Sequence, residues 1–82
     1  MNDTTNTDLI VSAFSKVLGL PEAQITDELQ YASIPQWDSI AHMSVIAALE
    51  EAFGIMIDMD DVIDMNSVSK ARQIVKKYTD GN

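Results

Sequence analysis

Residues 37–54 read WDSIAHMSVIAALEEAFG, and this pattern predicts one helix with well-marked ends. Asp38 and Ser39 are residue types preferred at a helix N-terminus, because their side-chain oxygens accept hydrogen bonds from free backbone N–H groups. Gly54 is the type most often found just after the last turn. The side expected to face the core carries, at steps of three and four, Ile40, Met43, Ile46, Leu49 and Phe53. The side expected to face solvent carries little charge and consists of Ala41, Ser44, Ala48 and Glu51.

Another amphipathic helix is expected toward the N-terminus, where apolar residues recur at helical spacing. These residues are Leu9, Ile10, Ala13, Phe14, Val17 and Leu18. Gly19 and Pro21 then end the helix. Residues 1–7 are polar and carry no apolar pattern, so a flexible tail is expected there. Residues 19–37 lack strong periodicity, which predicts a long loop with one helical turn after Pro21.

The acidic run at residues 58–64 is expected to contain a short helix. This helix would turn Val62 and Ile63 toward the core and leave its carboxylates as a solvated face. A calcium loop is excluded, because the positions of such a loop that need Gly and Glu hold Ile63 and Ser69.

A last helix is expected to begin at Asn66 or Ser67 and to be followed by a second flexible tail over residues 79–82. Its apolar stripe consists of Val68, Ala71, Ile74, Val75 and Tyr78. The expected fold is therefore all-α, a four-helix bundle with three longer helices, one short helix and a long first loop. We expect a single domain over residues 1–82, with its core over about residues 8–78.

The composition narrows the classes of function. With 82 residues, the chain is too small to enclose an enzyme active site beside its own core. Five basic and thirteen acidic residues give a net charge of −8, which disfavours nucleic acid and favours basic protein surfaces. The absence of cysteine excludes disulfides and zinc–thiolate sites. No apolar segment approaches the roughly 20 residues of a membrane span, and no signal peptide is visible, so a soluble, cytoplasmic monomer is expected.

Ser39 is the candidate functional residue, and it has two interpretations. A helix cap is the commoner role of an Asp-Ser pair before an apolar run. The alternative is a functional role, for which the surrounding sequence has to supply the evidence.

The wider pattern resembles the acyl and peptidyl carrier protein family. In that family the second helix opens with Asp-Ser-Leu or Asp-Ser-Ile, as at residues 38–40, and ends with Leu-Glu-Glu-x-Phe-Gly, as at residues 49–54. Residues 27–29, Asp-Glu-Leu, match the segment before the signature. Ile57 with the acidic run matches the start of the third helix, and Ser67-Val68 with Ala71 matches the fourth. The resemblance extends over residues 9–78.

The resemblance implies that Ser39 receives 4′-phosphopantetheine from coenzyme A through a phosphopantetheinyl transferase. The thiol of this arm would carry acyl groups as thioesters to acyl-activating, condensing and acyl-transfer enzymes. Asp38 would cap the helix and help to position the modification reaction. The chain itself would have no catalytic residue and no metal site.

The family also implies an acyl pocket and a docking surface. The expected pocket residues are Ile46, Leu49, Ile57, Val62, Met65, Val68 and Ala71. The expected docking residues are Ile40, Ala41, Ser44, Glu50 and Glu51. Many fatty-acid carriers have acids where this chain has Ala41 and Ser44, so we expect a specialised fatty-acyl or polyketide pathway, with a peptidyl or aminoacyl carrier as the alternative.

Trp37 and His42 lie close to Ser39 in the sequence. Trp37 is expected to pack as a hydrophobic staple onto the helix. His42 is expected to face solvent beside the arm. The rival functions are an unmodified helical interaction module and a small hydrolase that uses Ser39, the second lacking an oriented third group.

Overall fold

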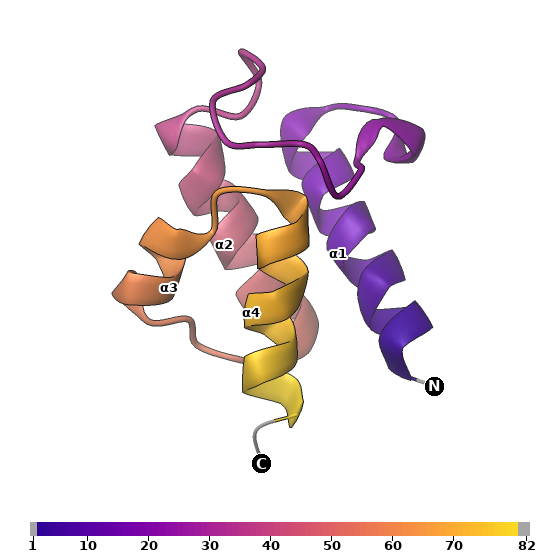
Figure 1. Ribbon diagram of the computed structural model, residues 1–82, viewed down its shortest axis with the longest axis vertical. Helices are drawn as coiled ribbons and strands as arrows, with labels where there is room; N and C mark the ends of the chain where they lie inside the picture. The colour runs from indigo at the N-terminus through magenta and orange to yellow at the C-terminus, as the bar shows by residue number, and fades with distance from the viewer. Residues whose placement is uncertain (1, 81–82) are drawn as a thin grey trace.

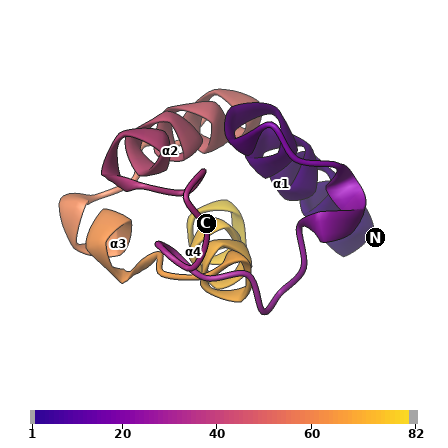
Figure 2. The ribbon, with the colours of Figure 1, turned by 90° about the horizontal axis from the view of Figure 1, so that it is seen from above.

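The computed structural model describes the backbone of residues 2–80 and the side chains of residues 8–79. It contains α1 (Asn2–Leu18), the 3-10 turn η1 (Glu22–Gln24), α2 (Ser39–Phe53), α3 (Met59–Asp64) and α4 (Val68–Asp80). The three long helices surround the core, and the short α3 lies beside α2 and α4 (Figure 1). The long segment between α1 and α2 passes across one end of the bundle (Figure 2). The predicted all-α fold with three longer helices and one short helix is confirmed.

Two helices extend further than the sequence predicted. α1 already begins at Asn2 and α4 continues to Asp80, so residues 2–7 and 79–80 are helical rather than tails. Residue 1 and residues 81–82 lie outside the described residues. Periodicity misses such extensions, because the added turns carry polar residues and no apolar stripe.

The core is one cluster to which all four helices and the long loop contribute. Trp37, Phe14, Ile10, Leu49 and Met65 are among its largest fully buried side chains. Phe14 of α1 meets Trp37 edge to face, with ring centroids 5.0 Å apart. The aromatic pair joins α1 to the segment just before α2, and so fixes where α2 begins.

α2 is rotated relative to the prediction. Ile40 and Met43, expected in the core, are 78% and 51% exposed. Ala41 and Ala48, expected on the solvent side, pack partly against the core. The buried side chains of α2 are Val45, Ile46 and Leu49. Because α2 has apolar residues all round, the apolar pattern alone does not determine which side faces inward.

The long first loop is held to the start of α4 by backbone hydrogen bonds. The Val68 N–H donates to the Leu29 carbonyl over 3.0 Å, and the Tyr31 N–H donates to the Asn66 carbonyl over 3.0 Å. Gln30 and Ser67 form an isolated antiparallel bridge between these two bonds. The loop thus satisfies the free Val68 N–H at the N-terminus of α4, and the Ser67 hydroxyl, expected as a cap of this helix, accepts a hydrogen bond from the Lys70 N–H over 3.0 Å. Among the described residues, no helix is long and apolar enough to cross a membrane.

Candidate functional site

The N-terminus of α2 is capped by Asp38 and leaves Ser39 exposed. Asp38 has extended backbone angles, and its Oδ1 accepts a hydrogen bond from the Ala41 N–H over 2.8 Å. Ser39 is the first residue of the helix, and its side chain faces solvent. Because Asp38 is the residue that caps the helix, the hydroxyl of Ser39 is not needed for capping.

This geometry fits a phosphodiester on the Ser39 hydroxyl. The first turn of α2 has backbone N–H groups without helical partners and the positive end of the helix dipole, which both stabilise an anion. The first turn holds no acidic side chain of its own. Exposure of Ser39 at the head of the helix gives a modifying enzyme access to the hydroxyl.

Trp37 and His42 contact each other on the inner side of the first turn of α2. The prediction that His42 faces solvent is wrong. The indole N–H of Trp37 donates to His42 Nδ1 over 3.0 Å. The two rings stack with centroids 6.0 Å apart. His42 Nε2 lies 2.8 Å from the Val62 carbonyl oxygen on α3. The staple expected of Trp37 therefore forms, with His42 as its partner on the helix.

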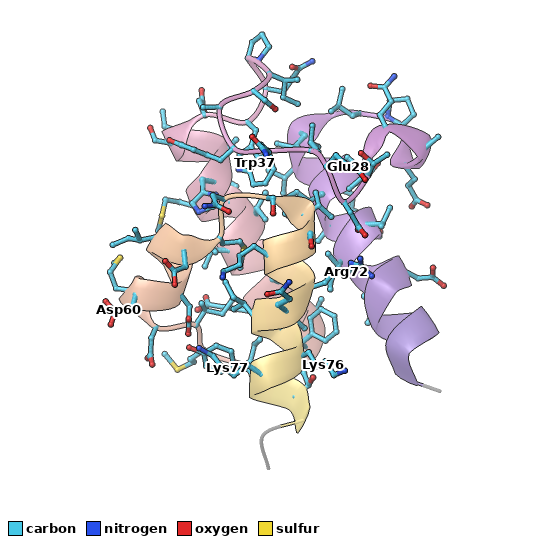
Figure 3. The ribbon with its side chains drawn as sticks, viewed as in Figure 1. Glu28, Trp37, Asp60, Arg72, Lys76 and Lys77 are labelled. Carbon is cyan, nitrogen blue, oxygen red and sulfur yellow. The ribbon has the colours of Figure 1, made fainter. Side chains whose placement is uncertain are left out.

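The seven residues expected to line an acyl pocket lie together in the core. Each of them is at most 9% exposed, and they belong to one cluster: Ile46, Leu49, Ile57, Val62, Met65, Val68 and Ala71. The cluster extends from α2, the helix that begins with Ser39, through α3 to α4. Figure 3 shows Trp37 at the head of this bundle, where the loop crosses it.

The structure revises the set of residues expected to dock partners. Ser44 and Glu51 are exposed as predicted, and Ile40, expected both in the core stripe and among the docking residues, is exposed as well. Ala41 is half-buried, and the Glu50 carboxylate accepts a hydrogen bond from the Ile57 N–H over 2.9 Å, so both have internal roles.

The sequence did not predict three exposed apolar residues of α2 and α3: Met43, Met59 and Ile63. Ile63, expected in the core, is 71% exposed, whereas its neighbour Val62 is buried as predicted. In a helix as short as α3 no second turn repeats the apolar pattern, so the sequence gives no signal to separate these neighbours.

Asp61 departs from the solvated acidic face that the sequence predicted. Its carboxylate is buried and accepts hydrogen bonds from the Lys77 ammonium at 2.8 Å and from the Tyr78 hydroxyl at 2.6 Å. These bonds, that of Lys77 first, lower the pKa of Asp61 below its ordinary value of 3.8. The same contacts raise the pKa of Lys77 and of Tyr78. Asp61 therefore joins α3 to α4 and is not free to bind a partner.

Comparison with known proteins supports a phosphopantetheine attachment site in this chain. Residues 8–73 match the family model described as a phosphopantetheine attachment site. A protein named acyl carrier protein from Desulforapulum autotrophicum is 38% identical over 58 residues, which cover 71% of this chain and 68% of that protein. An acyl carrier protein from Acidothermus cellulolyticus is 26% identical over 70 residues, which cover 85% and 83% of the two chains. The chain thus belongs to the phosphopantetheine-binding family of acyl carrier proteins, in which 4′-phosphopantetheine is the prosthetic group that carries the acyl chain.

Proposed function

We propose that Ser39 is the residue that carries the 4′-phosphopantetheine arm. The observation that supports this most is the position of Ser39, exposed at the first residue of α2 with the capping role taken by Asp38. In the attachment step the Ser39 hydroxyl oxygen bonds to the phosphorus of the pantetheine phosphate of coenzyme A. The pyrophosphate bond breaks, adenosine 3′,5′-bisphosphate leaves, and the hydroxyl proton goes to a base of the transferase. Asp38 keeps the first turn of α2 intact while this occurs.

The attached arm supplies a thiol that forms thioesters with acyl groups. The role of the protein is then to hold the arm at the head of α2 and to shelter its cargo. We propose that the buried cluster of the seven pocket residues opens to admit the acyl chain. Met65, fully buried within it, is unbranched and adapts to a change of volume more easily than a branched residue.

The partners proposed are a phosphopantetheinyl transferase and acyl-activating, condensing and acyl-transfer enzymes. They would dock on an apolar collar, defined here as Ile40, Met43, Met59 and Ile63 on the neighbouring helices α2 and α3. Exposed acids of α3, among them Asp60 and Asp64, would pair with basic residues at the edge of the partner. The apolar share of this surface favours a specialised fatty-acyl or polyketide pathway, with a peptidyl or aminoacyl carrier as the alternative.

We propose further that the chain has no catalytic activity of its own. Both ring nitrogens of His42, the histidine nearest in sequence to Ser39, already have hydrogen-bond partners. A serine hydrolase needs a histidine with a ring nitrogen free to accept the proton of its serine. We also propose that residues 1–82 form a single domain and that the protein acts as a monomer in the cytoplasm.

The test is the intact mass after incubation with coenzyme A, magnesium and a broad-specificity phosphopantetheinyl transferase. Wild-type protein is expected to gain one phosphopantetheine group, and Ser39→Ala none. Ser44→Ala is the matched control, because Ser44 is another exposed serine of α2, and it should be modified like wild type. Folded wild-type protein that stays unmodified with several transferases would favour the unmodified interaction module. Ester hydrolysis that disappears in Ser39→Ala would favour the hydrolase.

A further inference from the structure

His42 links two parts of the protein that are otherwise separate in sequence. Trp37 of the first loop contacts one ring nitrogen, and Val62 of α3 contacts the other, at 3.0 Å and 2.8 Å. The indole N–H only donates, so Nδ1 of His42 must accept and carry no proton. The carbonyl oxygen of Val62 only accepts, so Nε2 must carry the proton. A single protonation state, the neutral imidazole with hydrogen on Nε2, satisfies both neighbours.

A second proton on His42 is incompatible with the contact to Trp37. The added hydrogen on Nδ1 would point at the indole N–H, and two donors would face each other. Trp37 is fully buried, so its N–H has no water to turn to when it loses its acceptor. Protonation therefore favours states in which the indole and the imidazole have separated.

The charged neighbours of His42 do not offer a ready counter-ion. From the loop, Tyr31 presents an aromatic edge, with its ring centroid 5.2 Å from that of His42. The Asp38 carboxylate is engaged with the Ala41 N–H. On α3, Asp61 is bound by groups of α4, and Asp64 lines the groove between α3 and α4.

α3 depends on such side-chain links for its position. A helix of six residues is not stable in isolation, so its place is set by what holds each end. Asp61 and the backbone N–H of Asp58 are held by the Lys77–Tyr78 end of α4. The bond from His42 to the Val62 carbonyl holds the side of α3 next to the head of α2.

We propose that His42 is a pH-sensitive latch for Trp37: the neutral imidazole accepts the indole N–H, and the protonated imidazole releases it while Nε2 keeps its bond to the Val62 carbonyl. Release loosens the loop segment that carries Trp37 into α2, whereas α3 stays bonded to His42 through the Val62 carbonyl. The latch does not depend on the proposed function of the buried cluster as a pocket.

The chain is well suited to a direct test, because it contains one histidine and one tryptophan. Trp37 fluorescence of tag-free Ser39→Ala protein, which cannot carry an arm on Ser39, is followed from about pH 8 to 5. We expect a one-proton transition, which disappears in Ser39→Ala/His42→Gln. This control retains the α-amino group and every carboxylate, so the loss assigns the transition to His42. Ser39→Ala/Asp64→Asn, which removes a carboxylate of α3, should keep it.

Two further measurements separate a latch from a merely structural histidine. Nitrogen-15 chemical shifts at pH 8 should identify Nδ1 as unprotonated and Nε2 as protonated. Between about pH 8 and roughly 5.5, exchange of the Trp37 indole N–H should slow by about tenfold less than its intrinsic chemistry requires, which corresponds to the loss of one hydrogen bond. A protonated Nδ1 at pH 8, a fluorescence transition that persists in His42→Gln, or exchange that follows intrinsic chemistry alone would each overturn the latch. None of these measurements uses the arm, so failure of Ser39 as attachment site would leave their outcome unchanged.

Discussion

The hydroxyl of Tyr78, near the end of α4, donates a hydrogen bond to Oδ2 of Asp61 on α3 over 2.6 Å. The same hydroxyl accepts a hydrogen bond from the Asp58 N–H over 2.9 Å, and Lys77 binds both oxygens of Asp61. Figure 3 shows Lys77 at the end of the bundle opposite Trp37. α3 is therefore fixed to α4 at one end and to the head of α2 at the other, by two polar contacts of different chemistry.

The Asp61 contact predicts how stability changes in acid. Because the folded state lowers the pKa of Asp61 below 3.8, its contribution to stability is present above that pH and is lost as the pH falls further. Asp61→Asn should lower the free energy of unfolding at pH 7 by about 1–2 kcal/mol, since it removes the charge that Lys77 and Tyr78 bind. Urea unfolding at pH 7 and at about pH 3 measures both effects.

Asp60→Asn is the matched control for Asp61→Asn. Asp60 is the preceding residue, is exposed, and gives the same change of net charge without a bond to α4. Its free energy of unfolding at pH 7 should stay within about 0.5 kcal/mol of wild type. Equal losses in the two variants would mean that net charge, and not the bonds to Lys77 and Tyr78, sets the effect.

The cap of α2 should be separable from the modification reaction. Asp38→Ala removes the oxygen that accepts from the Ala41 N–H, and it should cost about 1 kcal/mol of stability, measured by urea unfolding. Asp38→Ser retains a capping oxygen and should recover most of that loss. If Asp38 also helps to position the transferase, Asp38→Ser should be as stable as wild type but modified more slowly. Equal rates for Asp38→Ser and wild type would limit Asp38 to its capping role.

Ala32 is held in a left-handed backbone conformation, with φ of 65°. The bond from its N–H to the Trp37 carbonyl, 3.0 Å long, closes the loop just before α2. Glycine lacks the steric penalty there but costs more entropy, so Ala32→Gly should raise the free energy of unfolding by about 0.5–1 kcal/mol. The same substitution at the exposed helical residue Ala47 should lower it by about 1 kcal/mol. Destabilisation by both variants in thermal unfolding would show that the loop does not strain Ala32.

The sequence predicted the helices, and the position of Ser39 at the start of α2, where local chemistry determines them. The Asp38–Ser39 start and the Gly54 end of α2 are set by backbone groups within one turn, so residue type is enough to place them. The inward side of α2 is not determined locally. It depends on Trp37 and on α3, which together draw His42 to the inside and leave Ile40 exposed.

The polar contacts could not be predicted for a related reason. Asp61 lies within an acidic run in which every carboxylate has the same local pattern. Its partners Lys77 and Tyr78 are 16 and 17 residues away and become neighbours only when α3 docks on α4. His42 resembles any exposed helical histidine in sequence until Val62 is placed beside it.

The apolar collar predicts a loss of recognition without a loss of stability. Ile40 is 78% exposed and follows Ser39 directly, so a partner that reaches the hydroxyl also covers this side chain. Ile40→Gln should leave the free energy of unfolding within about 0.5 kcal/mol of wild type. It should lower kcat/KM of the phosphopantetheinyl transferase about tenfold, because burial of an isoleucine side chain in the complex is lost. Leu9→Gln, on an exposed apolar residue of α1, is the control and should leave kcat/KM unchanged. An equal kcat/KM for Ile40→Gln and wild type would mean that the transferase recognises Ser39 through the charged and backbone groups of α2, with no contribution from the collar.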